Sequence, residues 1–240
     1  MKDDKENKNL NMEVKDEIVQ KVLILGDQKV GKSSLIRKLF NLTVKKSEFP
    51  FEYFNASDDS NNNYTINYEI YEIYGREDVV NYISSIKMGN PIAIIVYSFD
   101  NENSFNNIQN WINTINGCEN IIIIGNKKEL GDDKRVVSEQ KLEDFFDDYN
   151  YSHFETSAIE GSNVEELKKC LQEITIIKYE DLLRRRGIKR TSSMIEEKKA
   201  GGEVEINEKN LDEKRIVVAL AALNDLIIYL DINILINKIT

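Results

Sequence analysis

Histidine, cysteine and tryptophan are scarce in this chain of 240 residues. His153 is the only histidine, so a catalytic triad that needs a second histidine is excluded. The scarcity of histidine also argues against a zinc site. His153 is expected to pack or face solvent in a short strand. The two cysteines, Cys118 and Cys170, follow no metal-binding or pairing pattern, so we expect reduced packing residues in a compartment such as the cytosol.

The chain also lacks a basic excess and an uninterrupted apolar run. The net charge of −10 and a pI near 4.9 argue against nucleic acid as a partner, because neutralising phosphates takes excess Lys and Arg. Residues 1–17 form a polar lead-in without the apolar core of a secretion signal. Residues 216–236 are apolar, but Asp225 and Asp231 cost about 3 kcal/mol each in a bilayer and cancel the aliphatic gain, so no membrane span is expected.

The most informative stretch fits the phosphate-binding pattern G-x-x-x-x-G-K-[ST]. It follows an apolar run at 22–25, which predicts a buried parallel strand, and it precedes a helical pattern. A strand-to-helix turn that carries Lys and Ser by coincidence is the alternative, and it leaves these flanks unexplained. The residues expected to bind phosphate are Gly26, Asp27, Gln28, Lys29, Val30, Gly31, Lys32, Ser33 and Ser34.

The chemistry of this loop follows from its residue types. Gly26 and Gly31 lack a Cβ, so the backbone between them can curl and point N–H groups at phosphate oxygens. Lys32 adds a positive charge at the β- and γ-phosphates and is the first candidate catalytic residue. Ser33 offers a hydroxyl to a phosphate-bound Mg²⁺, and the helix N-terminus behind it favours negative charge.

Strand and helix patterns alternate through residues 18–186. Strands are expected at 22–25, in a hairpin around a polar turn at 58–63, and at 92–97, 121–124 and 152–155. Helices are expected after the phosphate loop and at 79–88, 101–115, 138–149 and 162–186, the last opened by a capping box of Ser162 and Glu165. This order predicts an α/β fold, a mostly parallel six-stranded sheet with helices on both faces and ligands at the carboxyl ends of its strands.

Two further motifs follow the phosphate loop: Gly-Asn-Lys-Lys-Glu at 125–129 and Glu-Thr-Ser-Ala at 155–158. Together with Val-Tyr-Ser-Phe-Asp at 96–100 and Trp111, they make the chain resemble a small GTPase of the Ras superfamily, most of all its Rab branch. The resemblance covers about residues 19–186. It implies a Ras-like P-loop domain that binds GTP or GDP with Mg²⁺.

The resemblance implies a role for each matching residue on the base side. Asn126 would tie the base loop to the phosphate loop, and the stem of Lys127 would lie over the guanine ring. Ser157 and Ala158 match the loop whose backbone amide contacts the guanine O6. Glu129 stands where the family has an Asp that accepts the guanine N1 and amino group, so the carboxylate is kept on a longer side chain.

The two switch regions depart from the family pattern. The Thr that follows a Pro and completes the Mg²⁺ shell is here Phe51, which has no oxygen to offer. The carboxylate that contacts Mg²⁺ through water is Glu72, so the expected metal set is Ser33 and Glu72. Arg76 stands where the family has the Gln that orients the attacking water. Its guanidinium stays protonated, so it could contribute to catalysis only as an internal arginine finger. We therefore expect nucleotide binding to be retained more than hydrolysis.

Residues 187–215 predict a charged linker and residues 216–240 an apolar extension. The basic cluster of Arg184, Arg185 and Arg186 with Lys189 and Arg190 either contacts an anionic membrane surface weakly or is a solvated helix end. No cysteine follows Cys170, so prenylation is not expected. Apolar residues at 216, 220, 223, 227, 230 and 234 have the spacing of a helix that packs on another copy, on the GTPase domain or on a partner.

The sequence therefore predicts a nucleotide-dependent switch in signalling or vesicle traffic, cytoplasmic or peripheral to membranes. Effector and regulatory proteins would bind through the switch loops, as the resemblance implies. The alternative is a pseudo-GTPase that serves as an interaction scaffold, which the departures at Phe51, Glu72 and Arg76 favour. The intact phosphate loop and Asn126-Lys127 favour the switch.

Overall fold

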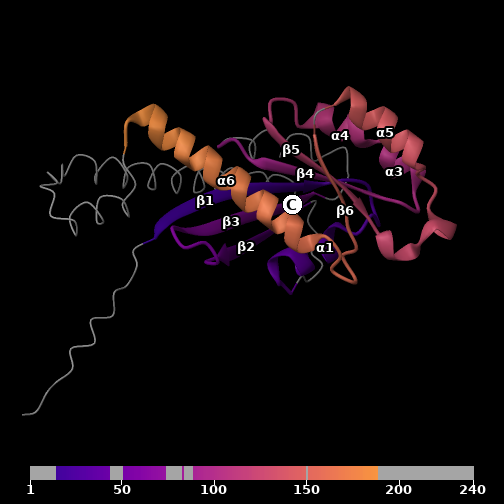
Figure 1. The fold of residues 1–240 in the computed structure, drawn as a ribbon, viewed down its shortest axis with the longest axis horizontal. Helices are drawn as coiled ribbons and strands as arrows, with labels where there is room; N and C mark the ends of the chain where they lie inside the picture. The colour runs from indigo at the N-terminus through magenta and orange to yellow at the C-terminus, as the bar shows by residue number, and fades with distance from the viewer. Residues whose placement is uncertain (1–14, 44–50, 74–82, 84–88, 150, 189–240) are drawn as a thin grey trace, which may run out of the picture.

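The computed structural model describes residues 15–43, 51–73, 83, 89–149 and 151–188. They form one six-stranded, mostly parallel sheet, as the sequence predicts, and its strand order is β2-β3-β1-β4-β5-β6 (Figure 1). The strands are β1 (Asp16–Leu25), β2 (Phe51–Asp58), β3 (Tyr64–Ile73), β4 (Ile92–Ser98), β5 (Asn120–Asn126) and β6 (Ser152–Glu155). The helices are α1 (Lys32–Phe40), α3 (Glu102–Asn106), α4 (Ile108–Thr114), α5 (Glu139–Asp148) and α6 (Val164–Arg186).

The sheet is parallel except at one edge. β2 and β3 form the predicted antiparallel hairpin, in which Glu52 lies opposite Glu72. β1 pairs in parallel with β3 and β4, and β5 extends the parallel part to β6. β4 is buried along its whole length, as expected of a central strand covered on both faces. The carboxyl ends of all parallel strands therefore lie on the side of the sheet where the predicted motifs follow them.

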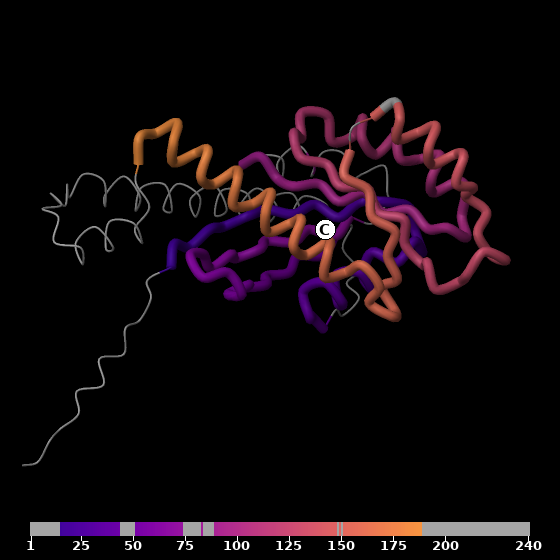
Figure 2. The backbone as a smooth tube through the Cα atoms, viewed as in Figure 1, coloured from indigo at the N-terminus to yellow at the C-terminus, as the bar shows by residue number. Residues whose placement is uncertain are grey.

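Each face of the sheet has its own apolar core. On one face α1 and α6 cover β1 through buried residues such as Leu35 and Leu171, and α6 crosses in front of β1 and β3 in Figures 1 and 2. On the other face Phe105, Ile108 and Leu142 from α3, α4 and α5 pack on Leu23 of β1. Side chains of β1 point alternately to the two faces of the sheet and are buried in both cores. This two-sided burial fixes the register in which β1 pairs with its neighbouring strands.

Two predicted helix features are wrong. The helix expected at 101–115 is split into α3 and α4 at Asn107, whose backbone (ψ −7°) ends one helix and begins the next. The capping box of Ser162 and Glu165 does not form, because α6 begins at Val164 and Ser162 is not its N-cap residue. The N-cap of α6 is Asn163, in the left-handed region (φ 58°), with its amide donating to the Glu155 carbonyl at 2.7 Å.

β1 begins at Asp16, two residues before the predicted start of the domain. Both ends of the chain, Pro50, Arg76 and all of the expected helix at 79–88 except residue 83 lie outside the described residues. Within the described part of the chain, no helix is long and apolar enough to cross a membrane. Cys118 and Cys170 are free thiols.

His153 lies in β6 and packs between aromatic rings. It stacks on Phe146 at a centroid distance of 4.2 Å, and its Nε2 lies 3.0 Å from the Tyr97 hydroxyl. Burial lowers the pKa of His153 to about 4, although the charge of Glu155 favours the protonated ring. The histidine is thus the packing residue that the sequence predicts.

The lowered pKa of His153 makes stability depend on pH. In the folded state the ring stays neutral down to about pH 4, whereas the unfolded chain takes up the proton at its usual value near 6.5. Stability is therefore lost as the pH falls between these values, by up to about 3 kcal/mol. Urea unfolding at about pH 7 and about pH 4.5 should show this loss, and His153→Gln should reduce it. An equal loss in the variant would contradict the assignment.

Candidate functional site

The phosphate loop leaves β1 at Leu25 and enters α1 at Lys32. Gly26 (φ 135°) and Gly31 (φ 102°) both have backbone angles that favour glycine. A Cβ on Gly26 would lie 2.1 Å from the Val96 carbonyl oxygen, and one on Gly31 would lie 2.2 Å from Asn126 Nδ2. Both glycines are therefore required for the loop to fit between β4 and the base-side loop.

Lys32 points back across its own loop. Its ammonium donates to the carbonyl oxygens of Gly26 (2.6 Å) and Asp27 (2.8 Å). The side chain is 5% exposed, and this burial lowers the pKa of Lys32 to about 8, against the charges of Glu72 and Asp27. A cation held without full solvation at a helix N-terminus attracts an anion strongly.

Ser33 and Glu72, the two predicted metal ligands, lie together. The Ser33 hydroxyl donates to Glu72 Oε1 at 2.6 Å. Glu72 is 1% exposed, and its Oε2 is buried with no hydrogen-bond partner in the described part of the chain. Burial raises the pKa of Glu72, the Ser33 and Lys32 contacts lower it, and the neighbouring Glu52 raises it again. This oxygen-rich pair beside Lys32 has the donors that Mg²⁺ prefers.

Glu52 is a buried carboxylate that the sequence analysis missed. It is 5% exposed and lies opposite Glu72 in the β2–β3 hairpin. Because paired residues share a face of the sheet, both carboxylates face the side covered by α1. Its sequence context, between Phe51 and Tyr53, gave no signal of this, since the partner is twenty residues away in the chain.

The carboxylate of Asp27 fixes the phosphate loop to the α3–α4 junction. Asp27 accepts a hydrogen bond from the Asn107 amide at 2.7 Å and another from the Trp111 indole at 3.0 Å. The sequence analysis assigned Trp111 to the core stripe. Its ring does pack against that core, but its N–H reaches the phosphate loop. The split between α3 and α4 lies at Asn107, one of the two donors to this carboxylate.

Asn126 links the base loop to the phosphate loop, the contact that the resemblance implies. Its buried amide donates from Nδ2 to the Val30 carbonyl at 2.9 Å. Its Oδ1 accepts from the Ala158 backbone N–H at 3.1 Å and from the Thr156 hydroxyl at 3.3 Å. One side chain therefore joins three predicted motifs at the carboxyl ends of β1, β5 and β6.

The remaining base-side residues surround Asn126. Lys127 has a left-handed backbone (φ 71°), and its ammonium contacts both carboxylate oxygens of Asp100 at 3.0 Å. Glu129 follows in a short 3₁₀ helix, η2 (Lys128–Leu130), and its Oε2 is buried without a hydrogen-bond partner among the described residues. The backbone N–H of Ser157 donates to the Ser162 carbonyl at 3.2 Å.

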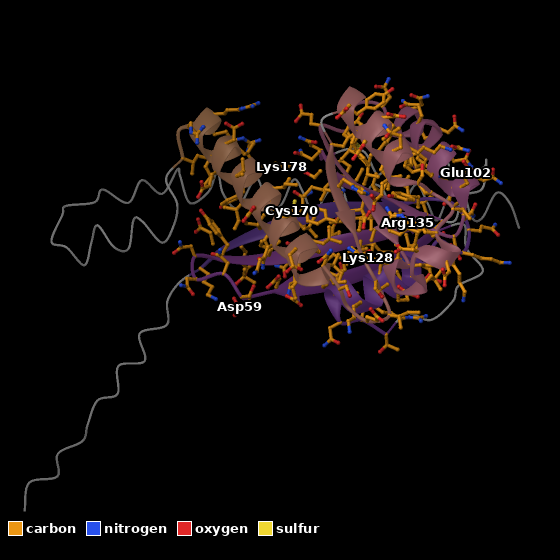
Figure 3. All side chains as sticks on the ribbon, turned by 45° about the vertical axis from the view of Figure 1, so that its right-hand side comes forward. Asp59, Glu102, Lys128, Arg135, Cys170 and Lys178 are labelled. Carbon is orange, nitrogen blue, oxygen red and sulfur yellow. The ribbon has the colours of Figure 1, made fainter. Side chains whose placement is uncertain are left out.

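Ion pairs brace the loop that follows β6. Glu155 contacts Arg135 at 2.8 Å and Lys128 at 3.3 Å, and Figure 3 labels both cations on this part of the molecule. Burial alone would raise the pKa of Glu155, but its hydrogen bond and ion pair with Arg135 hold it below the usual range. Glu155 thereby connects β6 to Lys128 in the base loop and to Arg135 in the segment after it.

Not all predicted site residues converge. Gln28 and Lys29 are exposed on the outer side of the phosphate loop, and Lys29 has a positive φ of 65°. Phe51 starts β2 and packs partly against the core, so it is a sheet residue. Arg76 lies outside the described residues. The structure brings together Lys32, Ser33, Glu72 and Asn126, with Glu129 and Lys127 following Asn126 on the base side.

Removing the Asn126 side chain should destabilise the fold as well as the site. Asn126→Ala leaves three buried polar groups without their partner, so we expect the free energy of unfolding to fall by roughly 2–4 kcal/mol. Urea denaturation measures this loss. The exposed Asn103→Ala is the control and should change stability by less than about 0.5 kcal/mol. Equal stability of both variants would contradict the proposed link.

Comparison with known proteins agrees with this geometry. The family model described as "Ras family" matches residues 21–176. GTP-binding protein yptV2 of Volvox carteri is 32% identical over 156 residues, which cover 61% of this chain and 70% of that protein. Ras-related protein RABE1e of Arabidopsis thaliana is 31% identical, with 61% and 70% covered. GTP-binding protein ypt1 of Schizosaccharomyces pombe is 31% identical, with 61% and 74% covered. The chain is a member of the Ras family of small GTPases and is Rab-like within it.

Proposed function

We propose that this protein binds GTP and GDP with Mg²⁺ and acts as a nucleotide-dependent switch in intracellular traffic. The observation that carries the proposal is the Asn126 link, which holds a phosphate-binding loop and a base-side loop at one edge of the sheet. Two relatives are named GTP-binding proteins, and others are named Ras-related. These names agree with the chemistry of the residues.

On the phosphate side, the residues fit a nucleotide with its metal. The two glycines let the loop pack closely on Val96 and Asn126, and Lys32 supplies a buried positive charge. Ser33 and the free oxygen of Glu72 are the groups that would hold Mg²⁺, Glu72 through water. Bound there, Mg²⁺ would neutralise part of the phosphate charge.

On the base side, a buried carboxylate oxygen without a partner suits guanine. The guanine N1–H and amino group are donors, and Glu129 Oε2 is an acceptor that no described residue satisfies. Adenine presents an acceptor at N1 and would leave this oxygen unpaired. We therefore propose that selectivity for guanine survives the replacement of the family's Asp by Glu129.

Hydrolysis is proposed to be slow. Unaided members of this class hydrolyse GTP at about 10⁻⁴ s⁻¹ and gain roughly 10⁵-fold from an activating protein. In this chain Arg76 replaces the residue that orients water, and a guanidinium cannot accept a proton near neutral pH. Binding and release of nucleotide, rather than turnover, would then set the state of the switch.

The cellular role follows from the Rab-like relatives and is part of the same proposal. The protein would act in the cytoplasm or at membrane surfaces, with effectors and regulators binding near the switch loops. The basic residues Arg184, Arg185 and Arg186 at the end of α6 would favour an anionic surface weakly. A scaffold without nucleotide is the competing function, and the next experiment separates the two.

The first test is to denature freshly purified protein and identify any released nucleotide by chromatography. We expect GDP or GTP in about a one-to-one ratio to protein, because tight sites retain nucleotide through purification. Exchange with GTP, ATP and XTP in Mg²⁺ then measures selectivity. Protein that carries no nucleotide and binds none of the three would contradict the switch function and support the scaffold function.

Removal of the Lys32 ammonium should weaken nucleotide binding. Lys32→Ala loses a charge-assisted hydrogen bond to phosphate, so the Kd for GDP should rise roughly tenfold to a hundredfold in a calorimetric titration. Lys38→Ala is the matched control, an exposed lysine on the same helix, and its Kd should be unchanged. An unaltered Kd in Lys32→Ala would refute the assignment of the phosphate loop.

The Glu129 carboxylate should decide between bases. Glu129→Ala removes the acceptor for two guanine donors, so the preference for GDP over ADP should fall by roughly tenfold or more. Competition of the two nucleotides for the wild type and the variant measures this ratio. A ratio that stays the same in both would show that Glu129 does not contact the base.

A further inference from the structure

The phosphate loop carries a negative charge close to its positive one. Asp27 directly follows Gly26, and its charge acts on the buried ammonium of Lys32. A carboxylate opposes phosphate binding in two ways, because it repels the anion and can pair with the lysine itself. The position of this carboxylate therefore affects how strongly the loop can bind phosphate.

Two neutral donors from one helix hold the Asp27 carboxylate. Its Oδ2 accepts from Asn107 Nδ2 at 2.7 Å, and its Oδ1 accepts from Trp111 Nε1 at 3.0 Å. Asn107 is the N-cap of α4, and its carbonyl accepts from the Trp111 backbone N–H at 3.1 Å. One helical turn thus places both donors on the same side of α4, where they act as a clamp on one carboxylate.

The two side chains of this clamp are themselves positioned by other contacts. Asn107 Oδ1 accepts from Asn110 Nδ2 at 3.2 Å, which leaves the Asn107 Nδ2 to face Asp27. The Trp111 ring packs partly against the core that contains Phe105. Because both donors are held in place, binding the carboxylate requires no further ordering of their side chains.

The main chain of Asp27 has a different role from its side chain. Its carbonyl oxygen accepts from Lys32 Nζ at 2.8 Å, and the Gly26 carbonyl accepts from the same ammonium at 2.6 Å. An ammonium has three N–H donors, so these two contacts leave one for a phosphate oxygen. A change of rotamer can turn the Asp27 carboxylate toward that ammonium, since both belong to one loop. It would then take the donor that phosphate needs.

We propose that Asn107 and Trp111 are positioning residues for nucleotide binding, which hold the Asp27 carboxylate away from Lys32 and keep the lysine ammonium available to phosphate. The inference rests on the proposed function, because phosphate is the part of the nucleotide that Lys32 would contact. It adds α4 to the elements that determine affinity. The clamp acts through Asp27 and need not touch the nucleotide.

A clamp of this kind differs from a simple anchor for the loop. If the two hydrogen bonds only anchored the loop, removing the Asp27 carboxylate would loosen the loop as much as removing either donor. If they restrain a competing charge, removing the carboxylate also removes the competitor. Loss of the Asp27 side chain should then be harmless, and it should cancel the effect of losing a donor.

The test measures how fast radiolabelled GDP leaves the full-length protein in Mg²⁺ when unlabelled GDP is added in excess. Trp111→Phe keeps an aromatic ring but loses the N–H, and Asn107→Ala loses the other donor. We expect either change to speed release roughly threefold to tenfold. Asp27→Ala should stay within about twofold of the wild type, and Asp27→Ala combined with Trp111→Phe should return to that rate.

Asn106→Ala is the matched control, because Asn106 directly precedes the clamp in the chain and is exposed. Its release rate should equal that of the wild type. Thermal melting checks that each variant is folded at the assay temperature, and Asn107→Ala and Trp111→Phe test the clamp independently.

Three results would overturn the inference. Unchanged release in both donor variants would show that the clamp has no role in binding. Fast release from Asp27→Ala, or from the double variant, would identify the hydrogen bonds as a simple anchor. Wild-type protein that binds no GDP would overturn the proposed function together with this inference, whereas the other two results leave the proposed function intact.

Discussion

Three hydrogen bonds of one buried amide, that of Asn126, hold the two halves of the candidate site in a fixed relation. The side chain spans from the phosphate loop to the segment after β6, and each of its polar atoms is used. Gly31 must be a glycine because that amide packs against it. The site is therefore not a set of independent motifs, since the position of each loop depends on the same contact.

The buried charges at this site lower the stability of the folded protein. Lys32 and Glu72 are both buried, and burial shifts the pKa of each toward its neutral form. Glu52 adds a second carboxylate beside Glu72. Charges buried in this way are costly without a partner of opposite sign. A ligand that carries phosphate and a divalent cation would supply both signs, so under the proposed function the same burial that costs stability would contribute to nucleotide affinity.

The sequence predicts the parts of the fold and site that depend on neighbours in the chain. Continuous apolar runs predicted β4 and β5, and the G-x-x-x-x-G-K-S pattern predicted the turn from β1 into α1, where Ser33 contacts Glu72. The first half of β1 was missed because its burial does not follow its hydropathy: Asp16 and Gln20 are buried, whereas Val19 is exposed. Contacts across long separations, such as Asp27 with Trp111, leave no local pattern. The capping box failed because α6 begins one residue later than the pattern requires, with Asn163 as its N-cap.

The hydrogen bond from Trp111 to Asp27 has an experimental consequence. This chain contains a single tryptophan, so its indole fluorescence comes from one known place. That indole donates its N–H to a carboxylate within the phosphate loop. Indole emission responds to nearby charge and hydrogen bonding, and no other tryptophan dilutes the signal. The protein thus carries a native optical probe of its phosphate loop, which would report the binding of a ligand to that loop without a label.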